Sequence, residues 1–244
     1  MPDYVTIDAI IMIYFITRLV SNISYLIPIN NALSETASLD ILTKNIPAPD
    51  FAHKKLMKLF KTYSIIGGMP EIVEKYSDQK DIIALNRIFD SLIVSYLDDV
   101  EKYARNVVSP PLLPNIKKSP RLQVLDTGML NYFSGFQKDL FGANSIDSVY
   151  QGKIAEHIVG QELLAVETSP LFKLYFWNRE KKQSNAEVDY LIQYEGLLIP
   201  VEVKSAATGR LRSLHQFIDR APHKYAVRIY SGKLEINQIK TLNG

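Results

Sequence analysis

Cysteine is absent from the 244 residues, which excludes a disulfide-stabilised scaffold, a zinc site built on thiolates and a cysteine nucleophile. An excess of one charge is also missing, because 28 basic and 26 acidic side chains leave a formal net charge of only +2. The surface as a whole therefore cannot attract nucleic acid as a histone does, and any such contact must come from a local basic patch. The four histidines do not have the spacing of a zinc site.

Long hydrophobic runs are also lacking. The most apolar stretch, Ala9 to Thr17, is much shorter than the roughly 20 residues that a membrane-spanning helix needs. Asp3 places an acid where a secretory signal peptide carries positive charge. We therefore expect no contact with a membrane and a cytoplasmic location.

The composition is that of a globular protein, with 47% hydrophobic and 22% charged residues. In the first half, residues 1–45 carry no motif and stay poorly defined. Phe51 to Tyr63 has apolar residues at helical spacing, Gly67-Gly68 ends that helix, and Pro70 fits the first turn of a second one. Asp81 to Tyr103 has one apolar face and predicts the longest helix.

Prolines mark a boundary after this helical segment. Residues 109–120 contain four prolines and read as a linker, so we expect a helical domain over 46–108 and an α/β domain over 121–244. Five basic residues and no acidic one lie between Lys102 and Leu125, as a phosphate-facing stretch or as ordinary solvated surface.

The second half alternates strand and helix patterns, which predicts a mixed α/β fold around one sheet. Strands are predicted at 121–125, 174–177, 187–194, 197–204 and 225–230, and helices at 150–167 and 211–218, with a short helix capped near Asp126.

A hairpin carries the residues of greatest chemical interest. If Glu195-Gly196 is its loop, Asp189 lies opposite Glu202, and opposed carboxylates are unfavourable unless a cation lies between them. Hard cations such as Mg²⁺ bind carboxylate oxygens, and the Val203 carbonyl is a further candidate ligand. Lys204 shares the face of Glu202, because strand side chains alternate. A three-residue loop would shift this pairing by one residue.

A third carboxylate, Glu156, lies on a predicted helix face with Val159 and Leu163, and Gly152 and Gly160 leave space for close approach beside it. The functional hypothesis is a metal-dependent phosphodiesterase: Asp189 and Glu202 hold Mg²⁺, Glu156 completes the metal shell, and Lys204 activates water. The simpler alternative is a solvated face with one ion pair, Glu187 with Lys204, and the residues leave both readings open.

These residues resemble the PD-(D/E)xK nuclease core. Longer phrases are similar to the C-terminal half of bacterial and archaeal AAA-type ATPases that carry the domain of unknown function 4143. The phrases are Gly67-Gly-Met-Pro-Glu71, Leu125-Asp-Thr-Gly-Met-Leu130, Gly152-Lys-Ile-Ala-Glu156, Ala186-Glu-Val-Asp189, Pro200-Val-Glu-Val-Lys204 and Ser213-Leu-His215. The resemblance implies a helical segment followed by a restriction-endonuclease-like mixed sheet flanked by helices, in proteins that handle DNA.

Two parts of such proteins have no counterpart in this sequence. The phosphate-binding motif G-x-x-x-x-G-K-[ST] does not occur, so no ATP site is expected. A winged-helix-like segment expected before the nuclease-like domain has no room here. We therefore expect the chain to correspond to the C-terminal portion of such a protein.

Basic residues after Lys204 suggest a nucleic-acid surface, with Arg210, Arg212 and Lys224 as candidate phosphate contacts, although ordinary surface explains them as well. Two functions remain open. One is an Mg²⁺-dependent nuclease acting on DNA; the other is a catalytically silent DNA- or protein-binding module, with partner binding or self-association through the helical segment.

Overall fold

The computed structural model describes residues 3–8, 49–96, 102–107, 121–124, 126–137, 148–166, 174–179, 186–204, 211–232 and 235–240. The helices are α3 (Asp50–Ile66), α4 (Pro70–Gln79), the 3-10 turn η1 (Ile83–Leu85), α5 (Asn86–Tyr96), α6 (Thr127–Phe133), α8 (Ser148–Val166) and α9 (Arg212–Ile218). The strands are β1 (Asp3–Asp8), β2 (Lys102–Val107), β3 (Arg121–Gln123), β4 (Tyr175–Asn178), β5 (Glu187–Tyr194), β6 (Leu197–Val203), β7 (Tyr225–Ile229) and β8 (Glu235–Lys240).

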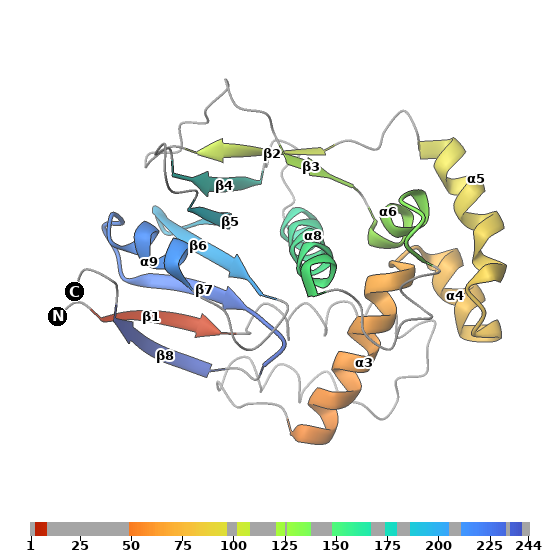
Figure 1. The fold of residues 1–244 in the computed structure, drawn as a ribbon, viewed down its shortest axis with the longest axis horizontal. Coiled ribbons are helices and arrows are strands. Elements are labelled where there is room, and N and C mark those ends of the chain that lie inside the picture. The colour runs from red at the N-terminus through yellow and green to blue at the C-terminus, as the bar shows by residue number, and fades with distance from the viewer. Residues whose placement is uncertain are drawn as a thin grey trace.

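The strands form one mixed sheet of eight, in the order β3-β2-β4-β5-β6-β7-β1-β8 (Figure 1). β4, β5 and β6 are joined by antiparallel pairing, whereas β6 with β7, β7 with β1 and β2 with β4 are parallel. The described part of the chain is therefore α/β, as expected: most of its helices come first and a mixed sheet follows. The β5–β6 hairpin lies at the centre of that sheet.

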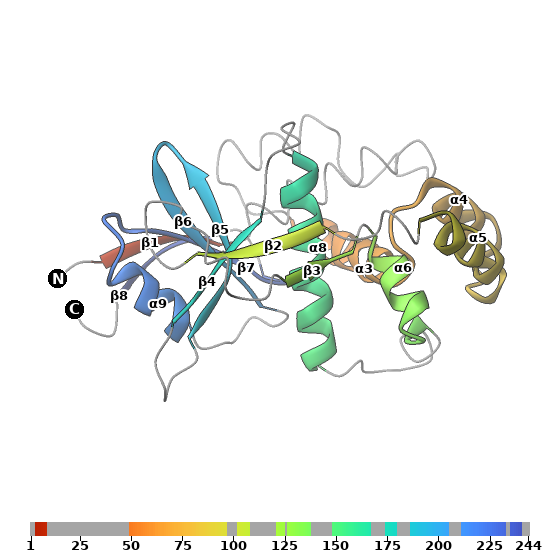
Figure 2. The same cartoon turned by 90° about the horizontal axis from the view of Figure 1, so that it is seen from above.

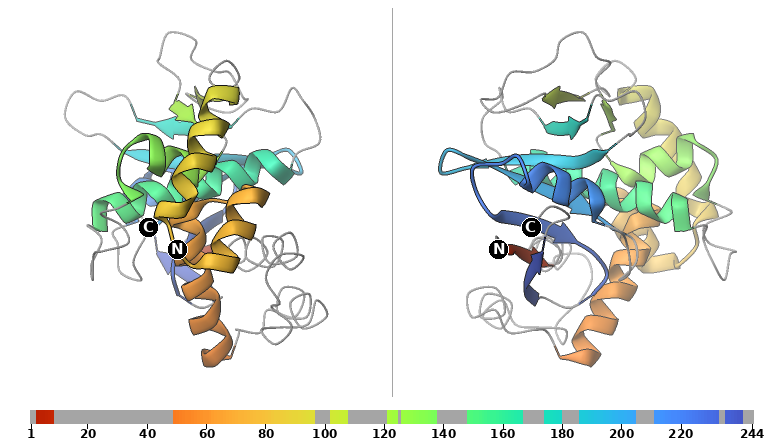
Figure 3. Two further views of the ribbon diagram at one scale, coloured as in Figure 1. Left: turned by 90° about the vertical axis from the view of Figure 1, so that its right-hand side faces the viewer. Right: turned by 60° about the vertical axis from the view of Figure 1, so that its left-hand side comes forward.

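Helices cover the sheet on both faces. On one face, Val201 and Val203 of β6 share a hydrophobic cluster with Ile154 and Ile158 of α8. On the other face, a second cluster joins Leu214 and Ile218 of α9 to inward-facing residues of β5 and β6. Figure 2 shows α8 between the sheet and the helices α3 to α6, and Figure 3 shows those helices gathered at one end of the molecule.

Buried polar contacts join the α3–α4 turn to α6. Asp126 caps α6 by accepting the amide of Met129 at 3.0 Å, and its second oxygen accepts the amide of Gly68 at 2.8 Å. Gly128 lies against this turn so closely that a Cβ there would come 2.0 Å from the carbonyl oxygen of Ile66. A carboxylate and a glycine thus fix how the helical segment meets the second half of the chain.

The structure corrects one predicted element and adds two. The helix predicted over Asp81–Tyr103 is wrong at its end, because Lys102–Val107 forms β2 and pairs with β4 in the sheet. The longest described helix is instead α8, with 19 residues against 11 in α5. β1 and β8 were not predicted; they extend the sheet beyond β7. The predicted linker, 109–120, and the apolar run from Ala9 to Thr17 lie outside the described residues.

Among the described helices, none combines the length and apolar character that crossing a membrane requires.

Candidate functional site

The β5–β6 hairpin has the register that the sequence predicts for a two-residue loop. Pairs run from Tyr194 with Leu197 to Tyr190 with Val201. Glu195 and Gly196 form the loop with φ of 48° and 77°, the left-handed conformations that a type I′ turn requires. One further step of the same register places Asp189 beside Glu202.

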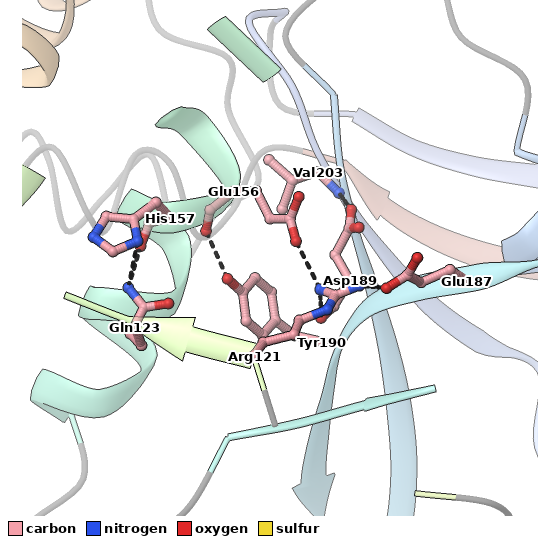
Figure 4. A network of polar contacts seen from close by, with 8 residues as sticks. All are labelled: Arg121, Gln123, Glu156, His157, Glu187, Asp189, Tyr190 and Val203. Carbon is pink, nitrogen blue, oxygen red and sulfur yellow. Dashed lines mark hydrogen bonds and ion pairs between the residues drawn. The ribbon is translucent and has the colours of Figure 1, made fainter. Parts of the chain in front are cut away.

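Asp189 lies where the pairing of β4 with β5 is irregular, because two steps along β4 correspond to three along β5. A bulge of this kind re-aims a side chain, and here the Asp189 carboxylate crosses to β6 and accepts the Val203 amide at 2.8 Å (Figure 4). Val188 belongs to the cluster on the α9 face and Tyr190 to the cluster on the α8 face. Asp189 therefore lies where β5 changes face.

Glu202 and Glu156 approach the hairpin from different sides. Val201 and Val203 lie in the α8 cluster, so strand alternation turns the side chain of Glu202 away from α8. Glu156 projects from α8 itself. Asp189 acts on the pKa of both Glu156 and Glu202, so we call these three acidic side chains, with Asp189 between the other two, the carboxylate row.

The pKa values of all three members of the row are raised. Burial raises the pKa of Glu156 to about 7 and that of Glu202 to about 7, and in each case the Asp189 carboxylate is the second largest cause. Glu156 has only the smallest effect on the pKa of Glu202. Burial also raises the pKa of Asp189, against the lowering effects of the Val203 amide and of the charges on Lys204 and Arg121.

Lys204 pairs with the most buried carboxylate of the row. Its Nζ lies 2.5 Å from Oε1 of Glu202, whose side chain is only 5% exposed. The second oxygen of Glu202, Oε2, is buried and has no hydrogen-bond partner among the residues that the structure describes. The Lys204 backbone is fixed by its amide, which donates to the carbonyl of Ile229 in β7 at 2.8 Å. A buried acceptor without a donor is costly unless a ligand satisfies it.

Arg121, at the start of β3, holds the other end of the row (Figure 4). Its Nη1 donates to Oε1 of Glu156 at 2.7 Å and to the backbone carbonyl of Asp189 at 3.2 Å. Its Nη2 forms an ion pair with Glu187, and the guanidinium lies 4.3 Å from the ring centroid of Phe176 in β4. One arginine thus joins β3, β4, β5 and α8.

Close packing keeps α8 beside β5. The hydroxyl of Tyr190 donates to the backbone carbonyl of Glu156 at 2.8 Å, and a Cβ on Gly160 would come 2.6 Å from that hydroxyl. The small residue predicted beside Glu156 is therefore required for the approach. His157, the next residue, contacts Gln123, and burial lowers its pKa to about 4, so it is neutral near pH 7 and no proton donor there.

The structure brings Glu156, Asp189, Glu202 and Lys204 to one region, but with partners that the sequence did not predict. The alternative ion pair of Glu187 with Lys204 is wrong, because Glu187 pairs with Arg121 and Lys204 with Glu202. The only sequence signal for Arg121 was its membership of the basic run between Lys102 and Leu125. That run says nothing about which carboxylates its members meet.

The arrangement of the three carboxylates limits how many of them can bind one divalent cation. In the ranges that the structure describes, no group of three or more His, Asp or Glu side chains lies close enough to share a metal ion. The Oε2 of Glu202 and the neighbouring Asp189 carboxylate form a smaller set of two candidate ligands. Mg²⁺ is commonly bound through one or two carboxylates together with waters and substrate phosphates. These two residues therefore fit such an ion; Glu156 does not join them as a third direct ligand.

The candidate phosphate-binding residues lie apart from this row. Arg212 and Lys224 are exposed, in α9 and directly before β7, and neither is among the charges that shift the pKa of the three carboxylates. Arg210 lies outside the described residues.

Comparison with known proteins gives one finding. Neither a curated protein nor a solved structure matches the chain. Residues 151–242, well under half of the sequence, match the model of a family described as a domain of unknown function, DUF4143. The match runs from α8 to β8, so it includes Glu156, Asp189, Glu202 and Lys204 but not Arg121. The second half of this chain is thus similar to the DUF4143 domain.

Proposed function

We propose that the chain carries a nuclease-type divalent-cation site of the PD-(D/E)xK kind and hydrolyses DNA phosphodiester bonds as part of an AAA-type ATPase system. The observation that carries the proposal is the buried Oε2 of Glu202, which has no partner in the described part of the chain and lies beside Asp189 and Lys204. The resemblance to the C-terminal half of AAA-type ATPases, together with the DUF4143 match, supports the link to an ATPase system.

Each residue has a separate task in this proposal. Asp189 and Glu202 bind Mg²⁺, which when bound lowers the pKa of a water molecule and offsets negative charge on the phosphate. Lys204 holds a positive charge beside Glu202 and can orient that water or the phosphate. Glu156 lies at the far end of the row. Its pKa of about 7 lets it exchange a proton near neutral pH, as a general acid or base does.

The test is nicking of supercoiled plasmid by the purified full chain with Mg²⁺ or Mn²⁺, compared with Asp189→Asn. Loss of a metal ligand should reduce the rate at least about 100-fold, since even residues behind the ligands cost 10–100-fold. Glu195→Gln, at the exposed hairpin tip, is the matched control and should retain the rate. Equal nicking by Asp189→Asn and the unmodified chain would remove the assignment.

One observation favours a second candidate, a catalytically silent module that binds DNA or a protein. Every carboxylate of the row already has a positive neighbour or an amide donor: Arg121 on Glu156, the Val203 amide on Asp189, and Lys204 on Glu202. Calorimetry without heat from Mg²⁺ or Mn²⁺, alongside retained binding of a DNA duplex, would favour this candidate. Arg212→Gln and Lys224→Gln should then each lower the salt dependence of DNA binding by about one phosphate contact.

A further inference from the structure

The surroundings of Arg121 are made of the same atoms that bind a cation. Its guanidinium is contacted by carboxylate oxygens of Glu156 and Glu187 and by the backbone carbonyl of Asp189. Carboxylate and carbonyl oxygens are the ligands of Mg²⁺ and Ca²⁺ in proteins. Arg121 therefore occupies an oxygen-lined position next to the central carboxylate of the row.

The position is well defined. The side chain of Arg121 is 25% exposed, and the guanidinium is stacked on Phe176 while its two terminal nitrogens reach α8 and β5. A planar fork fixed by several contacts loses little further freedom when it holds a carboxylate, which distinguishes it from a mobile surface arginine. Glu156 is held on the α8 side of Asp189 by this contact.

We propose that Arg121 is the built-in counter-ion of the carboxylate row: it neutralises the row, and a divalent cation at Asp189 and Glu202 binds against its charge. The inference rests on the proposed divalent-cation site. In it, Arg121 is a positioning residue that acts through Glu156 and Asp189. Because like charges repel and the Arg121 guanidinium lies against the backbone carbonyl of Asp189, removal of the Arg121 charge should tighten cation binding.

The experiment is isothermal titration of the full chain with Mn²⁺, using unmodified protein, Asp189→Asn, Arg121→Gln, Arg121→Met and Arg121→Lys. The two neutral variants should bind Mn²⁺ about tenfold more tightly, whereas the lysine variant, which keeps the charge, should stay within about twofold of the unmodified chain. Arg121→Met keeps an apolar contact for Phe176 and serves if the glutamine variant does not fold. Arg220→Gln is the control, because Arg220 also lies over an aromatic ring, that of Trp177.

The outcomes separate this inference from the proposed function. Equal Mn²⁺ affinity in the neutral variants and the unmodified chain, with binding lost in Asp189→Asn, would overturn the role of Arg121 and leave the cation site standing. No binding by any of the proteins would overturn both. Binding only by the neutral variants would support the role of Arg121 and identify the unmodified chain as the silent module. A general loss of stability, visible in thermal melts, does not by itself tighten Mn²⁺ binding.

Discussion

Replacing Glu202 by glutamine should raise the free energy of unfolding above that of the unmodified chain, and this gain should be larger at high pH than at low pH. Glutamine has the same shape and keeps a carbonyl oxygen for the Lys204 ammonium, but it cannot ionise. Glu202 has a pKa of about 7 in the folded protein, raised from 4.5 by burial and then by Asp189. Between these two values the folded state binds more protons than the unfolded state, so the free energy of unfolding falls as pH rises through that window.

The size of the effect follows from the shift. A rise from 4.5 to about 7 is about 2.5 pKa units, and each unit corresponds to 1.36 kcal/mol, so ionisation of Glu202 costs on the order of 3 kcal/mol in the folded state. Since the side chain is 5% exposed, solvent screening reduces this little. The cost is absent at pH 4 and complete at pH 8. The glutamine variant does not bear it at either pH.

Urea unfolding at pH 5 and pH 8, in the presence of a chelator, measures the difference. The stability of Glu202→Gln minus that of the unmodified chain should rise by about 2–3 kcal/mol between the two pH values. Glu156 and His157 also make the free energy of unfolding depend on pH, but they do so in both proteins, so their contributions cancel to first order. Glu195→Gln, an exposed glutamate in the same hairpin, should show no such change. A rise of less than about 0.5 kcal/mol would show that Glu202 is not buried beside another negative charge.

Two further substitutions test the framework around the site. Gly128→Ala should destabilise the chain by about 3 kcal/mol, because its Cβ would meet the carbonyl oxygen of Ile66 at 2.0 Å and backbone cannot move aside; an unchanged melting temperature would refute that contact. Glu195→Asn should stabilise the hairpin by about 0.5 kcal/mol, since asparagine tolerates the φ of 48° better than glutamate; a lower urea midpoint would contradict the type I′ turn.

The parts of the site that local pattern encodes were predictable from the sequence. Alternation on either side of Glu195-Gly196 gave the hairpin register, and with it the proximity of Asp189 and Glu202, because a two-residue loop leaves a single pairing. Asp126 before Thr127 predicted a helix cap, and the structure places that cap on α6. Gly160 beside the Glu156 face predicted a close approach, and Tyr190 makes it.

The parts that depend on distant strands were not predictable. The helix was predicted to run on to Tyr103, yet Lys102–Val107 pairs with β4 and β3 and forms a strand, which local propensity cannot show. The bulge at Asp189 arises from the pairing of β5 with β4, so the sequence of the hairpin alone could not show that Asp189 would sit between the two faces. The expectation of three carboxylates around one point assumed a regular strand.

The separation of Arg121 from the DUF4143 match has a functional consequence. The four residues predicted to bind metal or to act in catalysis lie within the matched stretch, whereas the arginine that contacts Glu156 comes from β3, outside it. If Arg121 acts as we propose, the same hairpin and helix carry a cation-binding row or a self-neutralised one, depending on what the preceding segment supplies at this position. A domain cut at residue 151 would lack Arg121, and its Mn²⁺ affinity would describe the row without its counter-ion. The proposed cation site and the role of Arg121 must for that reason be measured on the full chain, with Arg121→Gln as the only change.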